Sequence, residues 1–155
     1  MSLQNETNLK QQIKETFYKA MNDKLEDITF ENISQTDIEW LATLIDELRE
    51  RINKLTPNRI DLQVNLNKSI DINLLKQMLK HAAFEYNDLE MLVKTIFNRL
   101  YMLCAPIQDK KIKKMESQIL ESEFGKGLSL LIMECNLIID EIEQYVVEFK
   151  QNSMS

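Results

Sequence analysis

Apolar residues recur every three or four positions along most of the 155-residue chain. This spacing places them on one face of a helix and is typical of amphipathic helices packed around a core. Pro57, Pro106, Gly125 and Gly127 fall between the periodic stretches and mark breaks. The pattern predicts six helices, over about residues 6–24, 36–55, 71–82, 88–103, 108–122 and 128–150.

The stretch 36–55 carries the strongest helix pattern. Thr36 is the expected N-cap, and Glu39 three residues later completes a capping box that satisfies exposed backbone donors. Pro57 stops the helix, because proline disfavours helical backbone in the residue before it. The apolar face consists of Ile38, Leu41, Ile45, Leu48, Ile52 and Leu55.

The first helix carries a single apolar stripe at four-residue intervals, whereas the last helix is apolar over more than one face. The apolar faces of the second and last helices could each form an oligomer seam. We interpret these two faces mainly as core, because a stripe at helical spacing usually faces a neighbour. The last helix is still the best candidate for a partner contact or a homodimer. The stripe of the first helix is Leu9, Ile13, Phe17 and Met21.

Residues 60–67 give an ambiguous signal. Ile60, Leu62, Val64 and Leu66 alternate with polar residues, which on its own predicts a strand. The chain offers no second strand to pair with it. We therefore favour an irregular or short helical connection here.

Together these elements predict an all-α fold, a compact antiparallel bundle of about six helices. The length of the chain suits one domain, which we place at residues 1–150. The last residues, 151–155, are expected to form a disordered tail.

Composition excludes several classes of protein. The formal net charge of −6 argues against nucleic-acid binding, because such proteins carry basic faces. With 2 Gly and 2 Pro, the chain lacks the turns of a β-barrel and the glycine-rich loop of a phosphate site. Two cysteines indicate reduced thiols rather than a disulfide framework. The chain shows neither a membrane-spanning apolar run nor a basic apolar leader, so we expect a cytoplasmic protein.

Few residues suggest catalysis. His81 has Glu85 four residues later on the same helix face, as a base with an orienting carboxylate would, but a histidine near a helix end is also stabilised by the helix dipole. Cys104 and Cys135 are interpreted as small packed side chains, and with one distant histidine they make a poor zinc set. We therefore predict no catalytic residue, no cofactor, no metal site and no enzyme.

One basic cluster stands out in the acidic chain, and it consists of Lys110, Lys111, Lys113 and Lys114. It is a candidate patch for an anion, an acidic partner or a lipid headgroup. The alternative is an ordinary solvated face, with Ile112 pointing inward. Positive charge near a helix start is mildly unfavourable, which is the one physical hint of a role.

Several segments resemble the T-complex protein 11 family. Residues 48–52, 55–59 and 71–77 are similar to the start of that family's domain. Residues 102–109, Met-Leu-Cys-Ala-Pro-Ile-Gln-Asp, resemble the family signature Leu-Cys-Ala-Pro-Val-Arg-Asp. The resemblance covers about residues 44–115. 

Two departures from the family pattern are visible. Gln108 stands where the signature has arginine, and residues 81–84 replace an expected glycine-containing turn. Family members are generally much longer, so this chain is similar to an N-terminal core.

The resemblance implies a helical, non-enzymatic protein with a regulatory or adaptor role through protein contacts, linked to cyclic-AMP and protein kinase A signalling. It implies no catalytic residue in this chain. The alternative is an oligomeric structural component of a viral or protist assembly. 

For the signature we favour a structural role: small residues let helices approach, Pro106 ends one helix and Asp109 caps the next. The signature residues are Leu103, Cys104, Ala105, Pro106 and Asp109.

Overall fold

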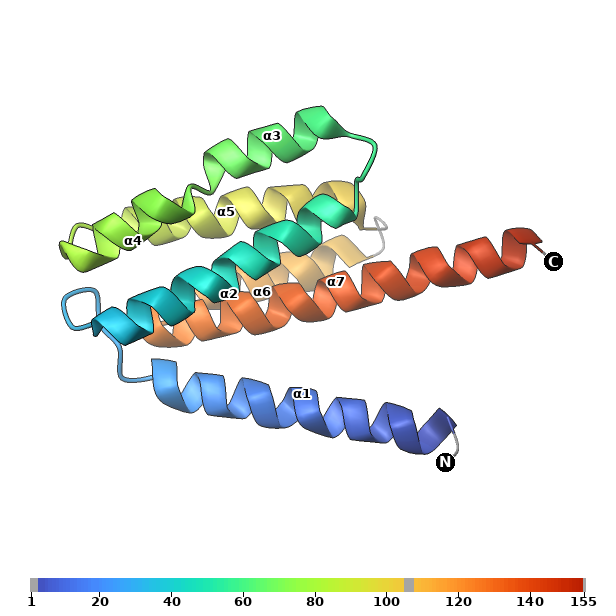
Figure 1. The fold of residues 1–155 in the computed structure, drawn as a ribbon, viewed down its shortest axis with the longest axis horizontal. Helices are drawn as coiled ribbons and strands as arrows, with labels where there is room; N and C mark the ends of the chain where they lie inside the picture. The colour runs from blue at the N-terminus through green and yellow to red at the C-terminus, as the bar shows by residue number, and fades with distance from the viewer. Residues whose placement is uncertain (1–2, 105–107, 155) are drawn as a thin grey trace.

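The computed structural model describes the backbone of residues 3–104 and 108–154, and the side chains of 8–104 and 108–146. This part of the chain is helical, with a single isolated bridge between Thr29 and Asn32, and the expected all-α bundle is confirmed (Figure 1). The described residues form seven helices where we expected about six. They are α1 (Leu3–Leu25), α2 (Gln35–Lys54), α3 (Ile60–Ser69), α4 (Ile72–Lys80), α5 (Tyr86–Leu103), α6 (Asp109–Glu121) and α7 (Phe124–Met154).

Helix α7 is the axis of the bundle. It packs against α1, α2, α5 and α6, and α1 forms an outer layer on one side (Figure 1). Leu131, Cys135 and Ile139 are fully buried, because neighbours cover α7 on several sides. The interpretation of this stretch as core is confirmed. Within the described residues, neither α7 nor any other helix has the length and apolar character to span a bilayer.

Helix α2 begins earlier than expected. Its N-cap is Ser34, whose Oγ accepts a hydrogen bond from the backbone N–H of Asp37 at 3.1 Å. Thr36 therefore lies inside the first turn, and the predicted capping box is wrong. The side chain of Glu39 instead pairs with Lys76 at 3.0 Å, which ties α2 to α4.

Residues 60–69 form helix α3, so the preference for a short helical connection is confirmed. Leu62 and Leu66 lie four residues apart and face the bundle, whereas Ile60 and Val64 form a second pair that is 71% and 45% exposed. Because the two pairs interleave along the chain, every second residue is apolar, and the sequence looks like a strand although the pairs lie on opposite faces of a helix. The nearly buried Arg99 holds α3 to α5 by donating to the carbonyl of Leu62 at 3.1 Å.

A tight turn after α4 contains the one non-glycine residue with positive φ in the described chain, Ala82 at φ 53°. The N–H of Ala83 donates to the carbonyl of Met78, and that of Ala82 to the carbonyl of Leu79. This pair of bonds is the Schellman motif, in which glycine normally occupies the left-handed position. The turn ends α4 at Lys80, slightly before the predicted end.

Gly125 and Gly127 lie inside the first turns of α7, so the break that we assigned to them falls earlier, at Ser122 and Glu123. Gly125 has a packing role. A Cβ atom there would lie 1.8 Å from the carbonyl oxygen of Leu25, at the end of α1. A glycine at this position therefore lets the backbones of α1 and α7 approach closely.

Helix α7 extends to Met154, whereas we expected a disordered tail over residues 151–155. Glu148, Lys150 and Gln151 are good helix formers, and no glycine or proline follows Gly127 to end the helix. The domain extent of 1–150 stays a prediction.

We predict that Gly125→Ala destabilises the protein by about 1–3 kcal/mol, because the new methyl group overlaps backbone that cannot turn away. Gly127→Ala is the matched control. Its Cβ would lie 3.3 Å from the Ile119 carbonyl oxygen, and alanine also favours helix, so little loss is expected. Urea denaturation measures both free energies of unfolding. Equal midpoints for the two variants would contradict the close approach.

We also predict that Ala82→Gly raises the free energy of unfolding by about 0.5–1 kcal/mol. Glycine removes the left-handed strain of about 1–2 kcal/mol, and its greater freedom in the unfolded chain cancels part of that gain. Ala83→Gly, at the neighbouring position without positive φ, should lower stability instead. Thermal melts compare the two; a loss in both variants would disprove strain at Ala82.

Candidate functional site

Helix α1 exposes most of its apolar stripe. Only the end of the stripe, at Met21, is buried with Leu25 in the core. The preceding side chains of Leu9, Ile13 and Phe17 are 52%, 61% and 43% exposed. Most of the stripe that the sequence places on one face of this helix therefore lies outside the core. These three residues, the α1 stripe, form a row of large apolar side chains with solvent access, which is typical of an interaction site.

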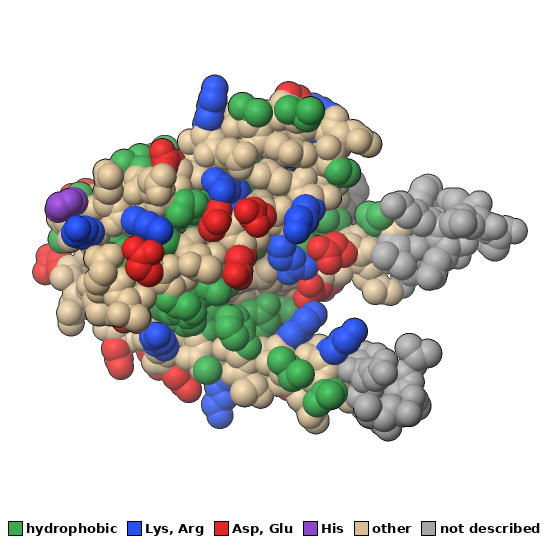
Figure 2. Space-filling view, in the orientation of Figure 1, with side chains coloured by type: hydrophobic (Ala, Val, Ile, Leu, Met, Phe, Trp, Pro, Cys, Tyr) green, Lys and Arg blue, Asp and Glu red, His purple; other side chains and the backbone are tan. Residues whose placement is uncertain are grey.

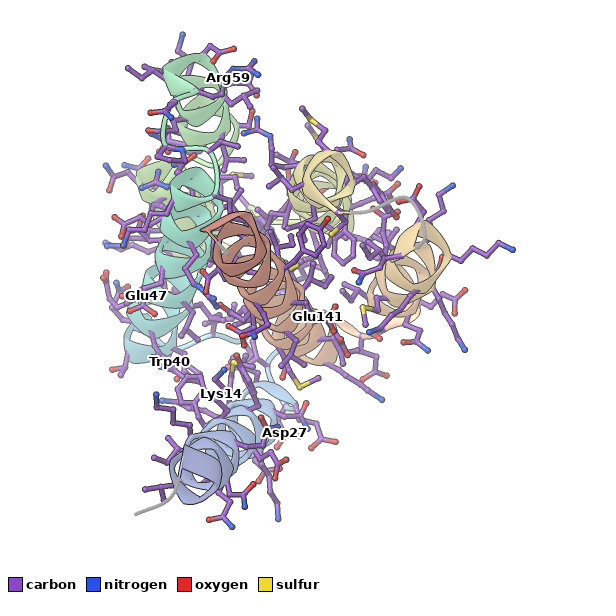
Figure 3. The ribbon with its side chains drawn as sticks, turned by 90° about the vertical axis from the view of Figure 1, so that its right-hand side faces the viewer. Lys14, Asp27, Trp40, Glu47, Arg59 and Glu141 are labelled. Atoms are coloured by element: carbon purple, nitrogen blue, oxygen red, sulfur yellow. The ribbon has the colours of Figure 1, made fainter. Side chains whose placement is uncertain are left out.

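Figure 2 shows how this surface is placed. Hydrophobic side chains gather in the hollow between α1 and the rest of the bundle and continue along α1. Trp40 of α2 lies on the side of its helix that faces α1 (Figure 3), and the ammonium group of Lys24 lies 4.5 Å from its ring centroid. Figure 1 shows α1 on the outer side of the bundle, beside α7. The exposed stripe of α1 adds apolar surface to this outer side of the bundle.

A groove of about 430 Å³ runs between α1 and α7. Its apolar lining comes from Tyr18 of α1 and from Leu130, Met133 and Leu137 of α7, all partly buried. We call it the α1–α7 groove. A concave apolar surface of this kind favours binding of an apolar group.

Ion pairs fasten α1 beside this groove. Lys14 Nζ lies 2.9 Å from Asp140 Oδ2, and Arg51 Nη2 lies 2.8 Å from Asp140 Oδ1. Arg51 also pairs with Glu143 at 3.1 Å and donates to Asn136 Oδ1 at 2.7 Å. Asp140 on α7 thereby links α1 to α2. Figure 3 shows Lys14 on the side of α1 that faces these helices.

The same contacts set the protonation of Asp140. Partial burial opposes ionisation, but hydrogen bonds and charge from Lys14 and Arg51 outweigh it and lower the pKa of Asp140. Burial, followed by the charge of Asp140, raises the pKa of Tyr18. Near neutral pH the carboxylate of Asp140 therefore stays ionised and the hydroxyl of Tyr18 stays protonated, so both groups have a structural role.

A second groove, of about 210 Å³, lies between α4 and α5. Leu74 and Met91 line it and are largely exposed, and the buried Phe84 closes one side. Asp71 and Asp88 also line it, and both carboxylates accept backbone N–H bonds at helix starts. These two acids therefore stabilise α4 and α5.

The family signature lies at the link between α5 and α6. Leu103 is the last residue of α5 and Cys104 is its C-cap, whereas Ala105 and Pro106 lie outside the described residues. The N-cap of α6 is Gln108, without a side-chain hydrogen bond. Asp109 is the first helical residue, so it stabilises α6 through the helix dipole rather than as the cap that we expected.

The cysteines are poor nucleophiles. Burial, with smaller effects from Glu141 and Asp109, raises the pKa of Cys104, and full burial raises that of Cys135 well above its usual value. The packed position that we expected is confirmed for Cys135, and Cys104 is partly buried.

The four lysines of the basic cluster lie in the first turns of α6 and are exposed, while Ile112 between them is buried as predicted. Lys111 pairs with Glu141 of α7 at 3.3 Å. The function of this cluster stays a prediction. The cluster consists of Lys110, Lys111, Lys113 and Lys114.

His81 is exposed at the C-cap of α4, and Glu85 is the N-cap of α5. The turn at Ala82 separates them, so the expectation that they share one helix face is wrong. In the part of the chain that the structure describes, no three His, Cys, Asp or Glu residues come together as a metal site.

Sequence reasoning missed both the open surface of α1 and the links at Asp140. Asp140 and Glu143 are three residues apart and share a helix face, which is a visible signal. Their partner Arg51 lies 89 residues from Asp140, so spacing cannot identify it. The narrow, one-column stripe of α1 was the available sign of incomplete burial.

Comparison with known proteins identifies relatives along most of the chain. The family model described as "T-complex protein 11" matches residues 2–147. The human protein named "T-complex protein 11 homolog" is 30% identical over 114 residues, covering 72% of this chain and 21% of that protein. Human "T-complex protein 11-like X-linked protein 1" is 30% identical over 82 residues, covering 52% of this chain and 16% of its own length. The chain thus spans about a fifth or less of these relatives. No solved structure matches it.

We predict that Asp140→Asn lowers the free energy of unfolding at pH 7 by about 1 kcal/mol, the upper range for solvent-accessible ion pairs. Because the folded-state pKa of Asp140 is lowered, its contribution is present above the unfolded value of about 3.9 and is lost as pH falls through the folded value. The stability gap between wild type and variant should therefore shrink below about pH 4.

Urea titrations at a series of pH values measure this gap. Asp23→Asn is the control, because Asp23 is an exposed acid of α1 without an ion pair in the described chain. A gap for Asp140→Asn that is as large in acid as at neutral pH would contradict the assignment.

Proposed function

The chain belongs to the T-complex protein 11 family, and from this premise we propose that it is a non-enzymatic protein-interaction domain with a regulatory, adaptor role. The observation that carries the proposal is the α1 stripe, whose large apolar side chains are about half exposed. Such surfaces gain free energy when a partner covers them, by about 25 cal/mol per Å². 

The ionisable groups support this choice over catalysis. Asp140 and Arg51 are engaged in ion pairs that join helices, and both cysteines have raised thiol pKa values. A catalytic site needs a perturbed group that faces a concave polar pocket. The exposed lining of the α1–α7 groove is instead mainly apolar.

We further propose that the regulated process is cyclic-AMP and protein kinase A signalling, and that the domain works in the cytoplasm. The family resemblance supports the signalling link. Binding of the purified chain to regulatory and catalytic subunits of protein kinase A, measured separately by calorimetry, tests the link. Absence of binding to either subunit would remove it and leave the interaction role intact.

An oligomeric structural role is the second candidate. It is favoured by the exposed Tyr145 and Val146 on the far part of α7, beyond the buried residues that end near Ile139. Analytical ultracentrifugation distinguishes the two functions. A large species whose size is independent of concentration supports the structural role, whereas a monomer supports the adaptor role.

We predict that the double variant Leu9→Ser, Ile13→Ser keeps its melting temperature but reduces partner capture about tenfold, because interface energy is concentrated in a few apolar anchors. Ile60→Ser, Val64→Ser is the matched control: it removes two exposed apolar residues at the same spacing from α3. Quantitative mass spectrometry of captured proteins compares the variants. Equal losses from both would contradict a specific role for the α1 stripe.

A further inference from the structure

We infer that the α1–α7 groove binds an amphipathic helix of a partner protein whose polar flanks are acidic. This inference deepens the proposed function and rests on it. It goes further by assigning the occupant's shape and charge. 

The shape of the groove suits a helix. Its wall on α1 runs from Gln11 to Asn22, about 17 Å at 1.5 Å per residue, which is three helical turns. The opposite wall is the ridge of Leu130, Met133 and Leu137 on α7. Apolar side chains spaced three and four residues apart on a partner helix would meet this ridge along its length. Methionine in the wall adapts to different side-chain shapes.

The charges at the groove determine which helix it favours. Lys19 on α1 and Lys126 on α7 lie on opposite walls, are exposed, and have no ion pair in the described chain. Lys14 is neutralised by Asp140, and the one acid in the lining, Glu15, accepts a hydrogen bond from Gln11. The groove therefore carries excess positive charge on a chain whose net charge is −6. Opposite charge on the partner strengthens and steers binding.

A second copy of the chain fits less well. Lys10 lies beside the α1 stripe and would bring like charge to the lysines of the groove, while Lys14 and Lys24 are already paired with Asp140 and Asp37. The acidic residues on the described end of α7, Glu141 and Glu143, are already paired with Lys111 and Arg51. A separate protein with free acidic flanks is the better occupant.

Two designed probes test this inference. Each is a fluorescent, side-chain-stapled helical peptide of about 14 residues, with leucine at positions i, i+3, i+4 and i+7. One carries glutamate and the other lysine at the flanking positions. Fluorescence anisotropy should give a dissociation constant about tenfold lower for the glutamate peptide, and added salt should reduce the difference.

Charge reversal locates the site. Lys19→Glu, Lys126→Glu should invert the preference between the peptides, and both side chains are exposed, so the fold should persist. Lys113→Glu, Lys114→Glu on α6 changes the total charge equally and should leave the preference unchanged. Equal affinity of wild type for both peptides, or an equal effect of the two double variants, would overturn the inference.

Self-association gives an independent outcome. If the wild-type chain sediments as a dimer that Lys19→Glu, Lys126→Glu dissociates, a second copy occupies the groove and the inference is wrong. If the glutamate peptide does not bind while the α1 stripe variant still loses its partner, the inference fails and the proposed function stands.

Discussion

The fold depends on the need to bury α7 on several sides. Its apolar residues from Leu128 to Ile139 occupy more than one face of the helix, and each large side chain gains about 1.5–3 kcal/mol when it is fully buried. One neighbour covers only one stripe of a helix. Four helices, α1, α2, α5 and α6, therefore surround α7, and α4 packs on α2 outside this inner group. The bundle is arranged around its most apolar element.

This arrangement leaves α1 in a different position from the other long helices. Met21 and Leu25 join the core, and the close approach at Gly125 fixes that end of α1 against α7. Toward its beginning, α1 is held by Lys14 and its ion pair with Asp140 rather than by buried apolar area. Elements with little buried area open at low free-energy cost. The helix that offers the exposed stripe is thus also the one that can adjust to a partner.

The sequence predicted the long helices correctly, but it did not predict which of their faces are covered by neighbours. Three-four spacing predicted every long helix, because it follows directly from helical geometry. It failed where the missing information was tertiary. The pairs in α3 look like a strand until one knows that Ile60 and Val64 face solvent, and the α1 stripe looks like core until one knows that Ile13 is 61% exposed. Periodicity shows which residues share a face, but not whether a neighbour exists. The same limit hid the link from Asp140 to Arg51, because neither residue indicates its distant partner.

Residues 81–84 replace the glycine-containing turn of the family pattern, and the structure explains physically how the turn still forms. A Schellman turn requires a residue in left-handed conformation, and this chain places Ala82 there at φ 53°. The turn persists because Leu79 and Phe84 on either side of it are buried, and their burial outweighs a strain of about 1–2 kcal/mol. Core packing therefore determines the path of the chain even where the local residue resists it. The α1 stripe is the opposite case: its residues favour burial, but the bundle covers only part of them. A partner that covers the α1 stripe would supply the missing surface.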